Sequence, residues 1–327
     1  MKPKAVLTTN VPRHVRAMLD EVCDLVLFPG PGRPTREWLL EVLPTVPGIL
    51  TSNQVRIDNE LIDACPNLRI ISNFGVGYDN VDIPHATGKG LLVCNTPGVL
   101  SDAVADLTFG FIIDLARGII TSDYFVRSGE WGKSQTPPLG VDLQGSTLGI
   151  LGLGRIGHIV AYRADAFGMQ TIYYDPARDR IAEAKGLAVY VERDDLFRQS
   201  DFVSVHVFLD ESTRHGIGAR EFGLMKQTAY FINTSRGPAV DQPALAEALR
   251  TGAIAGAALD VFEKEPLDPD DSILQSPNLI ATPHIASAAV NTRIAMAELA
   301  ARNLIASLTG GAPETMVNPE AHFVRQA

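Results

Sequence analysis

The sequence predicts an α/β protein of two domains, each containing a doubly wound parallel sheet. In the first hundred residues, short apolar runs alternate with polar stretches of helical character, and the alternation resumes at Thr147. This rhythm is typical of parallel sheets that are covered by helices on both faces. One glycine-rich motif, Gly152–Gly157, lies near the middle of the 327 residues. A chain of this length fits two domains of about 100–200 residues each.

The first series of apolar runs predicts the N-terminal sheet. Its strands are expected at Ala5–Leu7, Leu25–Leu27, Gly48–Thr51, Ile70–Asn73 and Leu91–Asn95. Its helices are expected at His14–Val22, Arg36–Leu43 and Asn59–Cys65. Pro44 ends the second of these helices, because proline has no N–H to continue the hydrogen-bond ladder. Ser101 and Asp102 then offer an N-cap for a long apolar helix from Ala103 to Ile119.

The second series predicts another sheet. Its strands are expected at Thr147–Leu151, Gln170–Tyr174, Asp201–Val205, Tyr230–Asn233, Ala257–Leu259 and Leu279–Ala281. A final helix is expected from about Asn291 to Leu308. The two long helices are the natural crossings between the domains. We therefore expect one domain of residues 1–101 plus 286–327, and a continuous second domain of residues 102–285.

The segment Ser122–Gln144, between the two series, is predicted to be a long loop. It contains Trp131 and the pair Pro137-Pro138. A structured loop of this length usually serves a function or an interface. A plain excursion over the surface is the alternative.

The glycine motif has the surroundings of a dinucleotide-binding turn, since it lies between a predicted strand and a helical segment. Gly152, Gly154 and Gly157 would permit a tight turn and the close approach of a pyrophosphate to a helix N-terminus. Asp175 ends the next strand, where a carboxylate can bind the adenosine ribose and repel a 2′-phosphate. The expected cofactor is NAD, although Arg178 could soften that preference and leaves NADP possible. An ordinary glycine-rich turn is the competing interpretation.

Composition excludes several classes of partner. The net charge of −10 argues against nucleic acid, although a local arginine could still bind a small anion. No apolar run approaches the length of about 20 residues that a membrane span needs, and the N-terminus lacks a signal-peptide core. Cys23, Cys65 and Cys94 are widely spaced. They fit reduced thiols in the cytoplasm, with no disulfide framework and no metal site.

Three polar residues follow predicted strands in the second half of the chain. They are Arg236, Glu265 and His284. Ligands of doubly wound sheets bind outside the carboxyl ends of the strands, so these side chains should face the place where a nicotinamide would lie. Taken one by one, the arginine could be a surface ion-pair partner, the histidine could bond to a turn, and the glutamate could lie in a solvated loop.

Beside the glycine motif, four stretches of the chain resemble one family, the NAD(P)-dependent D-isomer-specific 2-hydroxyacid dehydrogenases. They are Asn73–Asp82, Asn233–Gly237, Asp260–Pro266 and Thr282–Ile285. The resemblance implies two Rossmann-like domains with the active site in the cleft between them. Residues 1–101 plus 286–327 would form a flavodoxin-like, substrate-binding domain, and residues 102–285 the dinucleotide-binding domain. A homodimer is also implied, with a contribution from the Ser122–Gln144 loop.

The resemblance implies a role for each reacting residue. His284 would be the proton donor when a small anionic 2-oxo acid is reduced to a D-2-hydroxy acid. Glu265 would pair with it, orient its ring and favour its protonated form. Arg236 would bind the carboxylate and the carbonyl oxygen of the substrate and polarise the carbonyl. The backbone N–H groups of Val76 and Gly77 would bind the carboxylate as well.

The resemblance also implies the contacts of the cofactor. Asp260 would contact the nicotinamide carboxamide, and Arg155 and Ile156 would lie on the pyrophosphate. The other expected cofactor-binding residues are Val104, Gly152, Gly154, Gly157, Asp175, Thr234 and Ser235. Asp79 and Asp82, although they lie in a matching stretch, are interpreted as structural.

The segment Val76–Asn80 most resembles the glyoxylate, hydroxypyruvate and 2-ketogluconate reductase branch. Glu265 argues against formate dehydrogenases, which have Gln there, and Val76 against phosphite dehydrogenases, which tend to have Lys. Phosphoglycerate dehydrogenases usually carry a further regulatory domain, for which this chain is expected to be too short. The alternatives are a D-lactate-like enzyme, a phosphite dehydrogenase, or a non-catalytic NAD-sensing protein that resembles the co-repressors of this family.

Two positions depart from the family pattern. Phe208 stands where the motif His-x-Pro has its proline, in His206-Val207-Phe208, and Ala286 stands where a glycine is common. The first change alters the expected surface under the cofactor. The second adds a methyl group beside His284 and could narrow the pocket.

Overall fold

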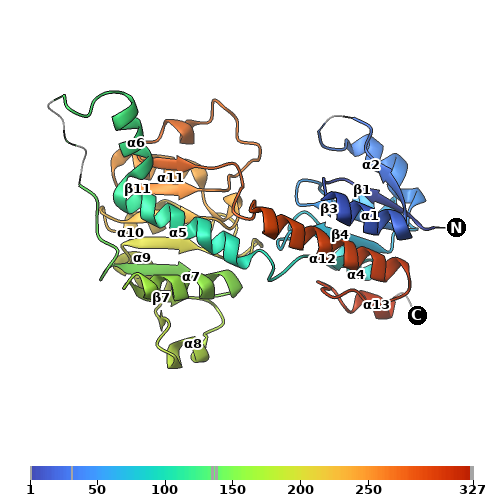
Figure 1. Cartoon of the computed structure of the whole chain (residues 1–327). Coiled ribbons are helices and arrows are strands. Elements are labelled where there is room, and N and C mark those ends of the chain that lie inside the picture. The colour runs from blue at the N-terminus through green and yellow to red at the C-terminus, as the bar shows by residue number, and fades with distance from the viewer. Residues whose placement is uncertain (1, 31, 134–135, 137–138, 325–327) are drawn as a thin grey trace. The chain divides into compact units, whose positions relative to one another are not determined.

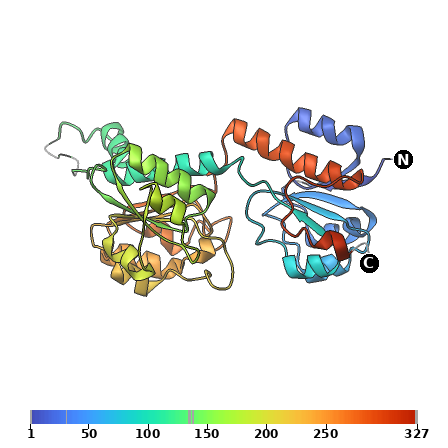
Figure 2. The ribbon, with the colours of Figure 1, turned by 90° about the horizontal axis from the view of Figure 1, so that it is seen from below.

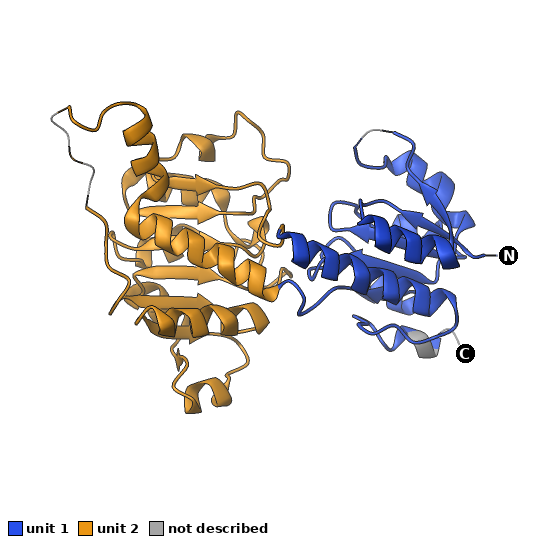
Figure 3. Ribbon diagram, viewed as in Figure 1, with its two compact units in different colours: residues 1–100, 289–327 blue, residues 101–288 orange. Residues whose placement is uncertain are grey.

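The chain folds into two compact units, described by a computed structural model over residues 2–30, 32–133, 136 and 139–324 (Figure 1). One unit comprises Met1–Leu100 and Ala289–Ala327, and the other is the continuous segment Ser101–Ala288 (Figure 3). Each unit is an α/β structure with its own parallel sheet. The predicted class, two parallel-sheet α/β domains, is confirmed.

The first unit contains a five-stranded parallel sheet in the order β2-β1-β3-β4-β5. Its strands are β1 (Lys4–Leu7), β2 (Asp24–Leu27), β3 (Gly48–Ser52), β4 (Ile70–Phe74) and β5 (Leu92–Cys94). Its helices are α1 (Arg13–Val22), α2 (Arg36–Val42), α3 (Asn59–Asp63), α4 (Ile83–Gly88), α12 (Val290–Leu308) and α13 (Ala321–Val324).

The last part of the chain completes the core of this first unit. Helix α12 packs on β3 and β4 and lies beside α1 (Figure 1, Figure 2). Ser72 of β4 donates a hydrogen bond through Oγ to the carbonyl oxygen of Ala300 in α12, at 2.8 Å. Met296, Ala300 and Leu304 of α12 are buried. The N-terminal sheet therefore depends on residues that the chain supplies only after the second unit.

The second unit contains a seven-stranded parallel sheet in the order β12-β11-β10-β9-β6-β7-β8. Its strands are β6 (Thr147–Leu151), β7 (Gln170–Tyr174), β8 (Val189–Tyr190), β9 (Phe202–Val205), β10 (Tyr230–Asn233), β11 (Gly256–Leu259) and β12 (Leu279–Ala281). Its helices are α5 (Ser101–Arg117), α6 (Ile119–Arg127), α7 (Arg155–Ala166), α8 (Arg180–Ala184), α9 (Arg193–Gln199), α10 (Ala219–Leu224) and α11 (Gln242–Thr251). After β8 the chain crosses to the other side of β6 and forms β9 there. The strand order therefore reverses between β6 and β9. Ligands of such sheets bind at this switch point, outside the carboxyl ends of the strands.

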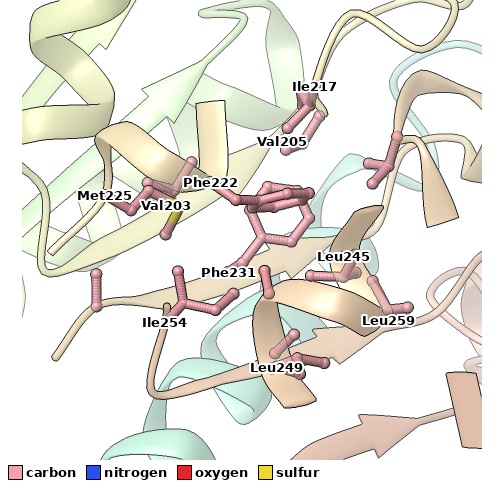
Figure 4. Packing of buried hydrophobic residues seen from close by; sticks show 14 of the residues in the cluster. Val203, Val205, Ile217, Phe222, Met225, Phe231, Leu245, Leu249, Ile254 and Leu259 are labelled. Carbon is pink, nitrogen blue, oxygen red and sulfur yellow. The ribbon is translucent and has the colours of Figure 1, made fainter. Parts of the chain in front are cut away.

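Apolar clusters cover both faces of this second sheet. On one face, residues of β9 to β11 pack against α9, α10 and α11. The rings of Phe222 and Phe231 meet there nearly at right angles, with centroids 5.3 Å apart (Figure 4). On the other face, α5 and α7 pack together over the sheet. Burial on both faces explains why the strands are continuous apolar runs rather than alternating ones.

The strand predictions are confirmed to within one residue at each end. The elements that were not predicted are α4, α13, β8 and the helices α8 to α11. Helix α4 begins after Asp82, whose side chain accepts a hydrogen bond from the backbone N–H of His85 at 2.9 Å, so this aspartate is a helix cap. The long helix starts at Ser101 and ends at Arg117, about two residues before the expected limits.

The prediction of a loop over Ser122–Gln144 is wrong at its start, because Ile119–Arg127 forms α6. Gly118 adopts a left-handed conformation with φ of 59°, which ends α5, and Asp114 accepts a hydrogen bond from the backbone N–H of Ile120 at 2.8 Å. These two features allow a new helix to begin at once. Pro137-Pro138 lies outside the described residues. Across the described ranges, no helix is long and apolar enough to cross a membrane.

Candidate active site

The glycine motif forms the turn between β6 and α7. Gly152 has φ of 94°, and a Cβ atom on it would lie 2.8 Å from the carbonyl oxygen of His206. A Cβ on Gly157 would lie 2.4 Å from the carbonyl oxygen of Gly152. A Cβ on Gly154 would meet no heavy atom within 4 Å. The fold therefore requires glycine at the first and third positions, whereas the second faces open space.

This open space fits the pyrophosphate of a dinucleotide. Gly154 is the N-cap of α7, and none of the described residues accepts a hydrogen bond from the backbone N–H of Arg155 or Ile156. Unpaired N–H groups and the positive end of the helix dipole favour an anion at such a place. The residues present thus fit the cofactor that the motif predicts.

Asp175 lies beside this turn, just after β7. Its Oδ2 accepts a hydrogen bond from the backbone N–H of Leu153 at 3.0 Å, and its Oδ1 accepts one from Ala177 at 2.9 Å. The two bonds hold the carboxylate against the glycine turn while the residue stays half-exposed. Asp175 is therefore fixed beside the glycine turn, and its contact with a ribose stays a prediction.

The three reacting residues follow three adjacent strands. β10, β11 and β12 are neighbours in the sheet and pair in parallel up to their carboxyl ends. Arg236, Glu265 and His284 come after these ends, and the structure brings Glu265 and His284 into direct contact. Nδ1 of His284 lies 2.7 Å from Oε2 of Glu265, with side chains 30% and 32% exposed. The other ring nitrogen, Nε2, forms no hydrogen bond with any of the described residues.

The ionisation of Glu265 follows from its surroundings. Burial alone would raise its pKa, but the hydrogen bond with His284, and the positive charges of His284 and Arg236, outweigh burial and lower it. Glu265 is therefore ionised at neutral pH. Since its folded pKa is depressed, its stabilising contribution is present above the ordinary carboxyl pKa and is lost as the pH falls through the lowered value.

The loop that carries Arg236 is held by Asn233, the last residue of β10. Oδ1 of Asn233 accepts hydrogen bonds from the backbone N–H and Oγ of Ser235 at 3.0 and 2.8 Å, and its Nδ2 donates to the carbonyl of Arg236 at 2.9 Å. Gly237 lies directly against the backbone of Phe262. A Cβ on Gly237 would lie 1.9 Å from the carbonyl group of Phe262, so only glycine fits there. The Arg236 loop thus packs on the loop that leads to Glu265.

The turn that carries His284 is held by Asp260. His284 has φ of 55°, a left-handed conformation that costs a non-glycine residue about 1–2 kcal/mol. Asp260 is fully buried and accepts hydrogen bonds from Thr282 Oγ1 at 2.6 Å, from the N–H of Ile285 at 2.8 Å and from the N–H of Ala286 at 2.7 Å. These bonds offset the cost and fix the histidine.

The structure places the remaining expected cofactor residues as follows. Thr234 is buried, and its Oγ1 lies 3.0 Å from Oγ1 of Thr108, which itself donates to the carbonyl of Val104. Val104 and Thr234 are therefore connected through Thr108. Sequence reasoning missed Thr108 and assigned no role to Asn233. In the sequence, each of them appears only as a polar residue in an otherwise apolar run. Structural and functional residues both have this appearance, so the sequence does not distinguish them. The prediction that Asp260 contacts the nicotinamide stays a prediction.

Val76 and Gly77 belong to the first unit, in the loop after β4. Asn95 Nδ2 donates to the carbonyl of Val76 at 2.8 Å, and Asn73 Nδ2 donates to the carbonyl of Gly77 at 2.7 Å. No described residue accepts a hydrogen bond from the N–H of Val76 or Gly77. The carbonyls of both residues are thus held by asparagine side chains, while their N–H groups stay unpaired among the described residues.

The two departures from the family pattern leave this arrangement intact. Ala286 is buried, with its N–H bonded to Asp260. Phe208 is 45% exposed. The His206 ring bonds to Ser204 Oγ at 2.8 Å, and burial lowers its pKa to about 4, so it is neutral at physiological pH. Within the described residues, no group of three or more His, Cys, Asp or Glu could hold a metal ion.

A glycine turn with unpaired N–H groups, together with a His–Glu pair and an arginine after neighbouring strands, is typical of a nicotinamide-dependent oxidoreductase. The family model for "D-isomer specific 2-hydroxyacid dehydrogenase, NAD binding domain" matches residues 109–286. The chain belongs to this family, the NAD(P)-dependent D-isomer-specific 2-hydroxyacid dehydrogenases. The family predicted from the motifs is confirmed.

Relatives narrow the branch. A glyoxylate reductase of Thermococcus litoralis is 46% identical over 325 residues, covering 98% of each chain. The structure of a glyoxylate reductase from Paecilomyes thermophila has a TM-score of 0.87 at 36% identity and covers 98% of this chain and 99% of that one. An NADPH-dependent glyoxylate/hydroxypyruvate reductase from Sinorhizobium meliloti, in complex with NADP and malonate, has a TM-score of 0.86 at 34% identity and covers 98% of both.

Proposed function

We propose that the protein uses NADH to reduce a small 2-oxo acid, either glyoxylate to glycolate or hydroxypyruvate to the D-2-hydroxy acid D-glycerate. The observation that carries this proposal is the His284–Glu265 pair, at 2.7 Å, in the same unit as Arg236 and the glycine turn. Relatives named glyoxylate reductase, similar over nearly the whole chain, support the choice of substrate. The related substrate 2-ketogluconate belongs to the same proposal.

The residues act on the substrate as follows. Nicotinamide, when bound, supplies the hydride that reaches C2 of the 2-oxo acid. Arg236 binds the carboxylate and the carbonyl oxygen and stabilises the negative charge that develops on that oxygen. His284 donates the proton from Nε2 to the same oxygen, while its Nδ1–H stays bonded to Glu265. The unpaired backbone N–H groups of Val76 and Gly77 support their proposed role as further ligands of the carboxylate.

The central test is the oxidation of NADH in the presence of single 2-oxo acids. Glyoxylate and hydroxypyruvate are expected to accelerate it most, ahead of 2-ketogluconate and pyruvate, because a small polar acid suits an arginine and two backbone N–H groups. Absorbance of NADH gives the rate. If no 2-oxo acid accelerates the oxidation although NADH binds, the protein is a non-catalytic NAD-sensing protein instead. Acceleration only by pyruvate would indicate a D-lactate-like enzyme.

We propose NAD rather than NADP as the preferred cofactor, on the position of Asp175 beside the glycine turn. Replacement of Asp175 by alanine is expected to erode the preference for NADH by about tenfold, since it removes the charge that repels a 2′-phosphate. The ratio of kcat/KM for NADH and NADPH measures it. The Sinorhizobium relative is described as NADPH-dependent, so the preference is not common to the family. A wild-type preference for NADPH would contradict the argument.

We propose a homodimer that forms through α6 and the residues after it. Ile120, Tyr124 and Trp131 are 60%, 73% and 75% exposed. Exposed apolar side chains grouped in this way mark an interaction surface, and a second copy of the chain is the proposed occupant.

Light scattering coupled to size exclusion tests the dimer. Wild-type protein is expected at twice the chain mass at micromolar concentration, and Tyr124→Asp should shift it toward the monomer. Ile181, which is 68% exposed on α8, provides the matched control: Ile181→Asp should leave the dimer unchanged. A monomeric wild type would refute the proposal.

We propose the cytoplasm as the location of the protein. Cys23, Cys65 and Cys94 are free and buried. Burial raises the pKa of Cys65 to about 11 and that of Cys94 to about 12, so both thiols stay protonated and unreactive. Unpaired cysteines support a reducing compartment.

A further inference from the structure

Arg178 lies in the turn between β7 and α8, three residues after Asp175. An arginine in this position could bind the 2′-phosphate of NADPH if its guanidinium were available. In the structure it is engaged. Nε of Arg178 donates to Oε1 of Glu183 at 2.7 Å, and Nη2 donates to Oε2 at 2.7 Å. The pair is a two-pronged bond that neutralises the arginine.

Further contacts hold this ion pair in place. The guanidinium carbon of Arg178 lies 4.8 Å from the ring centroid of Tyr190, in a cation–π contact. Tyr173, whose side chain is fully buried, donates its OH to Oε1 of Glu183 at 2.9 Å and accepts from the N–H of Asp179 at 2.7 Å. Both ends of the pair are therefore fixed, the glutamate by Tyr173 and the arginine by Tyr190.

Glu183 stays charged under all ordinary conditions. Its hydrogen bond with Arg178, with smaller contributions from the surrounding groups, lowers its pKa to about 2. The side chain is only 20% exposed, whereas that of Arg178 is 44% exposed. The Nε and Nη2 edge of Arg178 is occupied by this ionised, anchored carboxylate, so an incoming phosphate could reach only the remaining donors and would bind beside a negative charge.

We propose that Glu183 is a specificity-determining residue, which disfavours NADPH by holding Arg178 away from the adenosine ribose. The proposal rests on the proposed position of that ribose at Asp175. Two carboxylates then act against the 2′-phosphate in different ways: Asp175 repels it directly, and Glu183 withholds the arginine that would bind it. Loss of Asp175 alone should therefore leave much of the discrimination in place.

Titrations of NADH and NADPH without substrate test this inference, with the change in nicotinamide fluorescence as the signal. Asp175→Ala should lower the Kd of NADPH about tenfold, and Asp175→Ala with Glu183→Gln should lower it about tenfold again, the size expected for one charge-assisted hydrogen bond. Relative to Asp175→Ala alone, the added Glu183 replacement should leave the Kd of NADH within about twofold, which shows that the double variant is folded. Glu183→Ala in the same background is a second variant that removes the hydrogen bond entirely.

A third replacement identifies the cation. Arg178→Ala, added to the double variant, should abolish the second gain. If the gain persists, another group such as Arg180 supplies it, and the proposal is overturned. It is also overturned if neither Glu183 variant improves NADPH binding beyond Asp175→Ala.

A matched ligand pair locates the effect at the ribose. Adenosine 2′,5′-bisphosphate, competing with NADH, should show the same two gains, and 5′-AMP should show neither; equal gains for both would overturn the proposal. Failure of the proposed function has a different signature. If the wild type binds 5′-AMP but Asp175→Ala changes the affinity of neither ligand, the ribose does not lie at Asp175. If Asp175→Ala improves binding of the bisphosphate but the Glu183 variants do not, the ribose does lie at Asp175 and only the role of Glu183 is wrong.

Discussion

Replacement of His284 by alanine is expected to lower kcat for 2-oxo acid reduction by about 10²–10⁴-fold, the usual contribution of a general acid. The Kd of NADH should change little, because the histidine lies in the turn after β12 and the pyrophosphate turn follows β6. Steady-state kinetics and a fluorescence titration of NADH separate the two quantities. A loss of less than tenfold in kcat would remove His284 from the role of proton donor.

His215 provides a matched control for this prediction. It also has a left-handed conformation, with φ of 49°, and its Nε2 lies 3.0 Å from Oε2 of Glu263. Like His284, it therefore has a left-handed backbone and a glutamate partner, but it does not follow a strand of the sheet. His215→Ala should leave kcat within about threefold of the wild type. A large loss in both variants would point to disruption of the fold rather than to proton transfer.

Replacement of Arg236 by lysine is expected to lower kcat/KM by about 10²–10³-fold. The change keeps the positive charge but loses the planar fork that can bind a carboxylate and a carbonyl oxygen together. Hydrogen bonds to charged groups contribute about 1.5–3 kcal/mol each, and loss of one or two of them gives this range. The substrate dependence of the rate at saturating NADH measures the effect.

The control for Arg236→Lys is Arg250→Lys. Arg250 also makes a two-pronged bond to a carboxylate, Glu247, at 2.8 and 2.6 Å, but on an exposed face of α11. Exposed ion pairs of this kind contribute little, so activity should not change. If Arg236→Lys kept kcat/KM within about threefold, the charge alone would be sufficient, and the two-pronged binding of the substrate would be wrong.

Much of the fold could be predicted because the strands are buried on both faces and so appear as apolar runs. The elements that escaped prediction lack this signal. Strand β8 has only two residues, and α4 owes its start to the side chain of Asp82 rather than to an apolar pattern. Helix α6 has no buried residue, so it lacks the core contacts that mark the other long helices. Its start depends on the conformation of Gly118, which the residue type permits but does not specify.

The contact between Glu265 and His284 could be predicted from their positions after strand ends, but the residues that support them could not. Asp260 follows β11 just as Arg236 follows β10, and sequence alone cannot tell a buried carboxylate that holds a turn from one that contacts a ligand. The three hydrogen bonds that Asp260 accepts come from residues more than twenty positions further along the chain, and only the folded structure shows them. The left-handed conformation of His284 is likewise a property of the folded turn.

The three glycines of the motif differ in what constrains them. A methyl group on Gly152 or Gly157 would collide with the polypeptide itself, whereas one on Gly154 would enter open space, which is the proposed place of the dinucleotide. The three alanine substitutions should therefore differ in which property they change, the stability of the empty protein or the binding of the dinucleotide. Thermal unfolding of the empty protein would single out the first and third positions, and the second would show its importance only in competition with the dinucleotide. One short motif thus separates the requirements of folding from those of binding.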